Sequence, residues 1–257
     1  MDAPTAAAQV KINRWLPYWA VFQADVRQTL QSWVYRTWVF VSVLVTVGYS
    51  LYRYGAEHEA GILQSASHLV SDLLRWTLLG SVTLIIVLTV GSISSERGTM
   101  ADSILSRGIS RYQYFLGKWH ARLVTILATF FVLGAAALVS CHFLLHEDLS
   151  LIGSVAALVM VAALLAVVST CGVTVSALTN STVVGITALW VAVYGVGIVL
   201  SFLTRSTPSP TWLLQVLPNV LHGHFSWYTV ARFVGWSALT SAVAAVFGLG
   251  YFSRRDV

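Results

Sequence analysis

Six long apolar segments run along the chain, each bounded by charged or turn-favouring residues. They lie between Arg36 and Arg53, between Arg75 and Glu96, between Arg122 and His142, over residues 151–178, over 183–204, and between Arg232 and Arg254. A helix that crosses a bilayer needs roughly 20 apolar residues, so we expect six transmembrane helices. The segments are continuously apolar, whereas the strands of a membrane β-barrel alternate. The pattern therefore predicts an all-α polytopic membrane protein, with residues 1–257 forming a single transmembrane domain.

A turn rather than a charge separates the fourth and fifth of these segments. No Asp, Glu, Lys or Arg occurs between Asp148 and Arg205, a stretch too long for one crossing. The sequence "TNST" at 179–182 places four turn-favouring residues inside it. We therefore expect one helix to end and the next to begin there.

The composition agrees with a lipid environment. Charged residues make up 10% of the chain and the mean hydropathy is +0.76, whereas soluble domains carry about 25% charged residues. The net charge of +5 could indicate nucleic acid binding, but in so apolar a chain basic residues more often mark cytoplasmic loops. We expect a lipid bilayer and no nucleic acid among the partners.

The distribution of Lys and Arg predicts the orientation. Six spans place both termini on one side, and with that side cytoplasmic eleven Lys and Arg residues lie inside and four outside. The four outside are Arg53, Arg75, Arg205 and Arg232. By the positive-inside rule, we expect a multi-pass protein of the cytoplasmic (inner) membrane with both termini in the cytoplasm.

Residues 10–35 precede the first span and have their own periodicity. Phe22, Val26, Leu30, Trp33 and Val34 recur at steps of three and four, and polar residues fall on another side. This pattern is typical of a helix lying in the headgroup plane. The alternative is a cytosolic extension of the first span.

Charge is concentrated in one short segment, "SSERGTMADSILSRGISRYQYFLGKWHARL" at 94–123, which connects the second and third spans. We expect Gly98 to end the second span and Thr99 to cap a short amphipathic helix over 100–107. Gly108 is suited to the end of that helix. On spacing alone, a plain loop that satisfies the positive-inside rule explains the segment equally well.

A second helix is expected to start just after this short one. Ser110 and Gln113 have the spacing of a capping box, in which each side chain bonds the backbone N–H of the other. That helix continues into the third span, and we expect Lys118 and Arg122 to lie at the lipid surface.

The segment "ERGTMADSILSRGISRYQYFLGK" resembles the signature of type-2 ABC transporter permeases, the six-span membrane subunits of ABC exporters. The matching residues are Glu96, Gly98, Thr99, Leu105, Ser106, Ile109, Ser110, Arg111, Gly117 and Lys118. Gly108 stands where the family often has proline, and glycine can make the same bend. The N-terminal interfacial helix and the six spans agree with the family over the whole chain.

The resemblance implies a cytoplasmic coupling helix that docks in a groove of an ABC ATPase subunit. It also implies a second permease copy or homologue. The residues implied in coupling to the ATPase, within 96–118, are Glu96, Arg97, Gly98, Thr99, Asp102, Ile104, Leu105, Arg107, Gly108, Ser110, Arg111 and Lys118.

The chain itself has no nucleotide-binding motif. Gly117-Lys118 lacks a glycine five positions earlier and is followed by Trp119, so it does not form the phosphate-binding loop GxxxxGK[ST]. We therefore expect a transport subunit that is not an enzyme and binds no cofactor. ATP and Mg²⁺ would be bound by the partner subunit.

Two histidine pairs suggest an alternative, a membrane redox or haem-binding subunit. His222 and His224 lie in the external segment 205–232, and His142 and His146 lie at the outer end of the third span. Histidine is a common ligand of metals and haem. No carboxylate or cysteine pattern completes either pair, so ordinary interfacial histidines are the main expectation.

The external segment 205–232 contains two apolar stretches, each too short to cross, and three prolines that we expect to interrupt them. We expect short external, re-entrant helices here, before the last span.

Small residues in the fourth and fifth spans would allow close helix contacts: Gly172, Ser176, Ala177, Gly185, Gly195 and Gly197. Gly195 and Gly197 could lie at a subunit interface or within the chain's own packing. Cys141 and Cys171 are expected to be inert packing residues.

Overall fold

The computed structural model describes residues 15–60, 66–96, 109–144, 149–203 and 210–254. The described parts are helical and contain no strand, which confirms the all-α prediction. The helices are α1 (Leu16–Gln31), α2 (Trp33–Ala60), α3 (Ala66–Ser94), α5 (Arg111–Leu144), α6 (Leu151–Leu178), α7 (Thr182–Leu203), α8 (Pro210–Leu221) and α9 (Trp227–Arg254).

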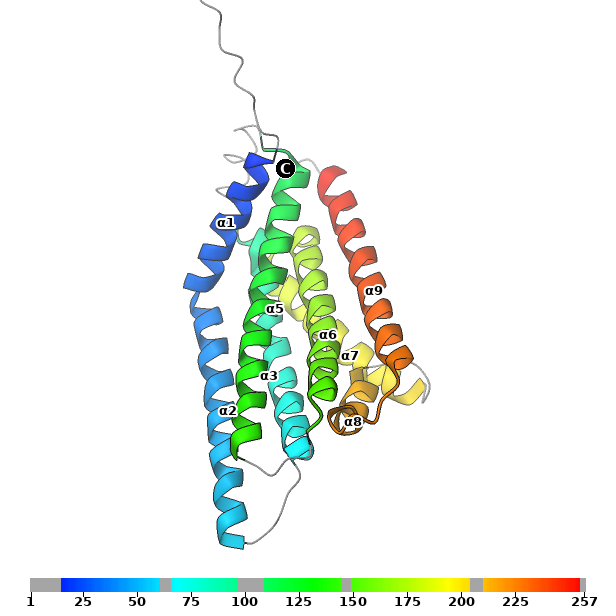
Figure 1. Ribbon diagram of the computed structural model, residues 1–257. Coiled ribbons are helices and arrows are strands. Elements are labelled where there is room, and N and C mark those ends of the chain that lie inside the picture. The colour runs from blue at the N-terminus through cyan, green and yellow to red at the C-terminus, as the bar shows by residue number, and fades with distance from the viewer. Residues whose placement is uncertain (1–14, 61–65, 97–108, 145–148, 204–209, 255–257) are drawn as a thin grey trace, which may run out of the picture.

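Five helices are long and apolar enough to cross a membrane, where six were expected. These spans cover Trp33–Tyr52, Leu69–Ser94, Arg111–Cys141, Leu151–Leu178 and Trp227–Arg254. The predicted fifth crossing corresponds to α7, whose apolar part over the described side chains is the shorter Thr182–Gly195. In Figure 1, α7 runs obliquely behind the other helices rather than along them. The turn at 179–182 is confirmed, but the helix that follows it is not among the five of membrane length.

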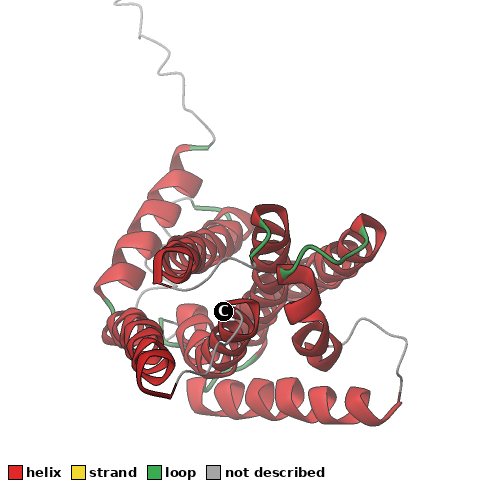
Figure 2. Cartoon of the chain, turned by 60° about the horizontal axis from the view of Figure 1, so that its bottom comes forward, coloured by secondary structure: helices red, strands yellow, loops and turns green. Residues whose placement is uncertain are grey.

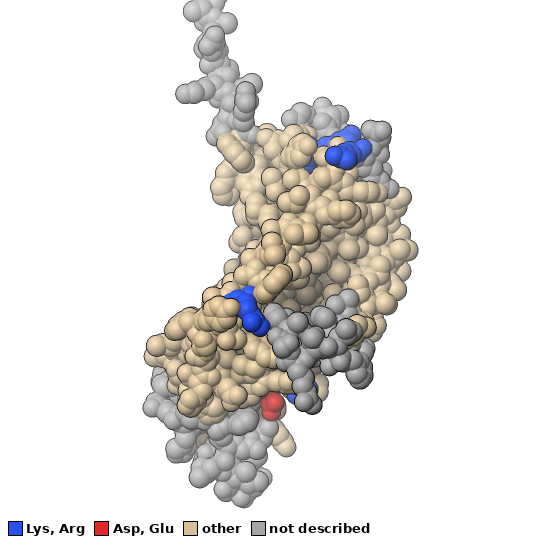
Figure 3. Space-filling view, turned by 90° about the vertical axis from the view of Figure 1, so that its right-hand side faces the viewer, with Lys and Arg blue, Asp and Glu red and all other residues tan. Residues whose placement is uncertain are grey.

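Helix α6 lies at the centre of the bundle. It packs against α9, α3, α5, α8 and α7. Figure 2 shows the helical bundle turned so that its lower end in Figure 1 comes forward. A helix that is apolar on all sides suits a position enclosed by other helices or by lipid. Residues along most of α6 are buried, whereas Leu151, Ile152 and Val155 near its start are exposed. The outer surface of the molecule is also apolar. On the side seen in Figure 3, Lys and Arg appear in only a few places.

The described ends of the chain lie together. The start of α1, the start of α5 and the end of α9 lie at the same end of the bundle in Figure 1. Helices α1 and α2 are separate because Ser32 adopts extended backbone, with φ −65° and ψ 141°. The helix expected to run through 10–35 is therefore interrupted at Ser32.

One face of α1 packs against the rest of the chain. Val21, Asp25 and Thr29 are buried, and α1 packs along α5. Leu30 and Trp33, which were expected on the apolar face, are exposed. Part of the predicted apolar face therefore points away from the protein, while the Asp25 carboxylate points into it.

The opposite end of the bundle is formed by α8 and the start of α9. Pro218 lies inside α8 rather than ending it, and the second expected short helix is the first part of α9. The start of α6 rests on the end of α8, because the Ser150 backbone N–H donates to the Leu221 carbonyl at 2.9 Å. A Cβ at Gly153 would overlap the Val220 carbonyl, so only glycine permits this contact.

Candidate functional site

Five side chains form a buried charge cluster at the end of the bundle where α5 begins. The cluster consists of Asp25 from α1, Glu96 just after α3, and Tyr114, Lys118 and Arg122 from α5. The three α5 residues are spaced by four and therefore share one face of that helix. Asp25, Lys118 and Arg122 are 2%, 3% and 5% exposed. Ionised side chains buried to this degree are expensive unless they are paired.

Lys118 uses all three of its donors. Its Nζ donates to Glu96 Oε1 at 2.8 Å, to the Ser92 carbonyl at 2.8 Å and to Asp25 Oδ1 at 3.2 Å. An ammonium group has three donors, so its hydrogen-bonding capacity is filled. The Nζ atom also lies 5.3 Å from the centre of the Tyr114 ring, within the range of a cation–π contact. One side chain thus joins α1, the end of α3 and α5.

Arg122 pairs with the same aspartate through two contacts. Its Nε lies 2.9 Å from Asp25 Oδ2, and one terminal nitrogen donates to Asp25 Oδ1 at 3.2 Å. Only the second contact has hydrogen-bond geometry, and the first is a close ion-pair contact. Asp25 consequently lies between two cations, and α1 is fixed to α5 by charge as well as by apolar packing.

Glu96 completes the cluster at its more exposed side. Its Oε2 accepts the Tyr114 hydroxyl at 2.8 Å, and its Oε1 accepts Lys118. Burial raises the pKa of this carboxyl, but the Lys118 charge and hydrogen bonds from Lys118, Tyr114 and Gln28 together hold the pKa below its usual value. Glu96 is therefore ionised at neutral pH and contributes a negative charge to the cluster.

The expected position of Lys118 and Arg122 at the lipid surface is wrong. Both are buried because α1 packs over them and supplies Asp25. Sequence reasoning also missed Asp25. A signal for it existed: the cations Lys118 and Arg122 lie in a helix that continues into a span and would need a counter-charge if buried, and Asp25 is the only carboxylate within Leu16–Gln31.

The structure places four of the twelve residues implied in coupling. Glu96 and Lys118 meet in the cluster. The Ser110 N–H donates to Gln113 Oε1 at 3.2 Å, and the Gln113 N–H donates to Ser110 Oγ at 3.3 Å, which confirms the predicted capping box. Arg111 donates to the Ser253 carbonyl of α9 at 3.4 Å. The other eight lie outside the described residues: Arg97, Gly98, Thr99, Asp102, Ile104, Leu105, Arg107 and Gly108.

The histidines do not assemble into a metal site within the part of the chain that the structure describes. No group of three His, Cys, Asp or Glu residues could hold a metal ion there. The rings of His222 and His224 have their centres 6.4 Å apart, and the side chains of His142 and His146 lie outside the described residues. His120 has a structural contact, since its Nδ1 lies 3.0 Å from the Tyr18 hydroxyl.

The small residues of α6 and α7 divide into two groups. A Cβ at Gly172 would overlap Thr89 of α3, and one at Gly185 would come within 2.7 Å of Val90, so both glycines lie at close helix contacts. Gly195 and Gly197 have nothing within 4 Å of such a Cβ, so neither lies at a tight helix contact with the residues that the structure describes. Cys141 and Cys171 are both free thiols, as expected of packing cysteines.

Comparison with known proteins does not identify the chain. No family model matches it, and no curated protein matches it either.

Proposed function

We propose that this protein is the permease subunit of an ATP-binding-cassette exporter. It would move a substrate across the cytoplasmic membrane with ATP hydrolysed by a partner subunit, and two permease copies or homologues would form each transporter. The support is the resemblance of residues 96–118 to the type-2 permease signature, together with five membrane-length helices in one bundle.

One observation carries the proposal: Lys118 bonds both Asp25 of α1 and Glu96 at the end of α3. Glu96 immediately precedes residues 97–108, the part of the segment that the resemblance assigns to ATPase contact. A force applied to that part would reach α1, α3 and α5 through a single group of buried charges. Rigid-body displacement of packed helices is an established form of transmission between distant sites.

A second contact extends the same path. Arg111, directly after the capping residue Ser110, donates to the Ser253 carbonyl near the end of α9. Helix α9 in turn packs along α6. In this proposal the end of the bundle that carries the charge cluster faces the cytoplasm, in agreement with the distribution of Lys and Arg.

The test is isolation of the full chain from its native membrane after chemical cross-linking. We expect a cytoplasmic subunit with the GxxxxGK[ST] motif to co-purify, and the complex to hydrolyse ATP. A chain that is recovered without such a subunit, both with and without cross-linker, would contradict the proposal.

Variants of the purified complex test the route of transmission. We expect Glu96→Ala and Arg111→Ala to uncouple hydrolysis from helix movement. The readout is an ATP-dependent distance change between spin labels at two exposed positions, Leu44 of α2 and Val243 of α9. This change should be lost while hydrolysis continues. Arg27→Gln, which removes an exposed charge on α1, is the matched control and should retain the distance change. An unaltered distance change in both variants would exclude this route.

A further inference from the structure

Two backbone N–H groups at the end of α3 bond a side chain of another helix. The Ile93 and Ser94 N–H groups both donate to Ser176 Oγ of α6, each at 2.9 Å. Within α3, the same two groups are directed toward the carbonyls of Thr89 and Val90, four residues earlier. A hydroxyl has two acceptor lone pairs, so one serine side chain can meet both groups. A side chain inserted in this way into the backbone ladder is an identified cause of helix bending.

The turn that carries these N–H groups is held by side chains as well as by backbone. Ser94 Oγ donates to the Val90 carbonyl at 2.7 Å, and Lys118 Nζ donates to the Ser92 carbonyl at 2.8 Å. Ser94 Oγ also lies 2.8 Å from Thr182 Oγ1, at the start of α7. A serine that bonds the carbonyl four residues earlier slightly destabilises a helix and often bends it. The last turn of α3 therefore depends on groups from α5, α6 and α7.

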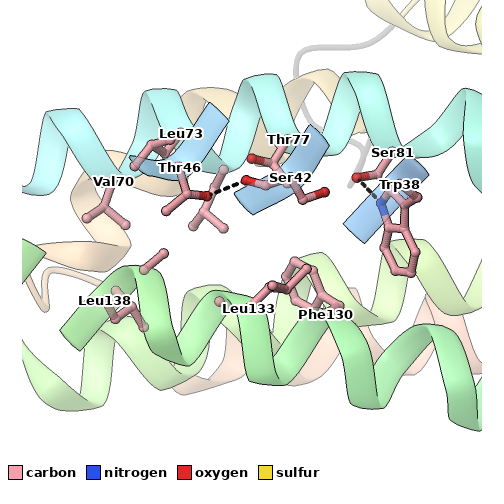
Figure 4. Close-up of a pocket in the computed structure, with 13 residues that line it drawn as sticks. Trp38, Ser42, Thr46, Val70, Leu73, Thr77, Ser81, Phe130, Leu133 and Leu138 are labelled. Atoms are coloured by element: carbon pink, nitrogen blue, oxygen red, sulfur yellow. Dashed lines mark hydrogen bonds between the residues drawn. The ribbon is translucent and has the colours of Figure 1, made fainter. Parts of the chain in front are cut away.

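The body of α3, in contrast, is fixed against its neighbours. The Trp38 indole N–H of α2 donates to Ser81 Oγ at 2.8 Å, and Figure 4 shows this bond joining α2 and α3. Thr89 lies so close to Gly172 of α6 that a Cβ at Gly172 would overlap its side chain. Soon after these contacts comes Gly91, and glycine weakens a helix more than any residue except proline. The helix can therefore bend at Gly91 while its body stays in place.

One buried hydroxyl in this turn has no partner among the described residues. Ser92 is 1% exposed, and its Oγ atom makes no hydrogen bond with them. Buried polar groups without a partner are rare in folded proteins and cost free energy. The described form of the turn thus carries a penalty that a second form of the same turn need not carry.

We propose that the end of α3, from Gly91 to Glu96, is a hinge and that the Ser176 hydroxyl holds it in the described form. When the hydroxyl is released, the Ile93 and Ser94 N–H groups bond only the carbonyls of their own helix, and Glu96 turns relative to the body of α3. Each N–H has an acceptor in both forms, so the two forms differ little in free energy. This inference concerns the chain alone and does not depend on the proposed transport function.

The test is a distance measurement by pulsed EPR on the full chain in lipid nanodiscs, with both cysteines replaced by alanine. Spin labels are placed at Ser95, an exposed residue of the hinge, and at Val132, an exposed residue of α5. The label removes the Ser95 bond to the Gly91 carbonyl from every variant alike. We expect Ser176→Ala to shift the main distance by at least about 1.5 Å, the rise of one helical residue.

The matched control is Ser169→Ala, about two turns earlier on α6. Ser169 is also fully buried, but its Oγ atom bonds none of the described residues, so its removal should leave the distance unchanged. An unchanged distance in Ser176→Ala, or equal shifts in the two serine variants, would overturn the proposal.

A second variant tests the hinge without touching Ser176. A Cβ at Gly91 would meet nothing within 4 Å, and alanine favours a regular helix over glycine. Gly91→Ala should therefore shift the distance in the same direction as Ser176→Ala. No shift in Gly91→Ala, or a shift in the opposite direction, would also overturn the proposal, and this result decides the matter if Ser176→Ala does not fold.

Discussion

The Asp25 carboxylate and the Arg122 guanidinium, 97 residues apart in the chain, form a two-contact ion pair inside the helix bundle. The same carboxylate also accepts a hydrogen bond from Lys118. Helix α1, which was expected at the membrane surface, is therefore joined to the spanning helix α5 through buried charges. The stability of this end of the bundle depends on the pairing being complete.

Removing the Asp25 charge tests this dependence. Asp25→Asn leaves Lys118 and Arg122 buried with one carboxylate fewer, and loss of one partner of a buried ion pair costs about 3–5 kcal/mol. We expect a decrease of that size in the free energy of unfolding, measured with denaturant in detergent micelles. Arg27→Gln, an exposed charge change on the same helix, should alter it by less than about 0.5 kcal/mol. Equal stability of Asp25→Asn and the wild type would mean that the pair contributes nothing.

The pH dependence of stability provides a test of Glu96. Its pKa is lower in the folded protein than the ordinary value of 4.5, so the unfolded chain binds the proton more readily. The stabilising contribution of Glu96 is therefore complete above about pH 4.5 and decreases as the pH falls through the folded pKa. We expect wild type to be more stable than Glu96→Gln at neutral pH, and the difference to shrink on acidification. A difference that grows toward low pH would reverse the assigned sign.

The capping box at the start of α5 can be tested with a double-mutant cycle. Ser110→Ala removes the acceptor for the Gln113 N–H, and loss of such a cap costs about 1 kcal/mol. Because Gln113 returns a bond to the Ser110 N–H, we expect Ser110→Ala and Gln113→Ala to be non-additive in the free energy of unfolding. Strict additivity would show that the two bonds form independently.

Gly172 in α6 and Gly195 in α7 allow a matched test of how closely these helices pack against their neighbours. Gly172→Ala places a methyl group against Thr89, which is fully buried, and overpacking of this kind costs about 1–3 kcal/mol. Gly195→Ala has open space around its Cβ and should be neutral or slightly stabilising, because alanine favours helix over glycine by about 1 kcal/mol. Thermal unfolding of both variants in the same detergent measures the difference. Equal melting temperatures would contradict the close contact between α3 and α6.

Much of the helix framework could be predicted because its boundaries are locally encoded. Helix α6 covers the predicted residues 151–178, since Ser150 caps its start by accepting the Gly153 N–H at 3.3 Å and Thr179 ends it in extended backbone. The start of α5 was predictable for the same reason. These signals are contained within four residues of the boundary that they define.

The missed features depend on contacts between distant segments. The orientation of α1 is decided by pairing of Asp25 with Lys118 and Arg122, and periodicity within Leu16–Gln31 carries no information about that partner. The course of α7 and the position of Pro218 within α8 are likewise not marked by a local sequence signal. An apolar pattern identifies a helix suited to lipid but does not fix its direction.

The order of the charged residues along the chain has a consequence for biogenesis. Asp25 and Glu96 both precede Lys118 and Arg122, so the ribosome completes each acid before the bases that it neutralises. We therefore expect the two cations of α5 to find carboxylates already synthesised when α5 is inserted, so that neither base has to enter lipid alone. A circular permutant that synthesises α5 ahead of α1 would lack this advantage, and its membrane insertion should fail more often even though its finished fold would be the same.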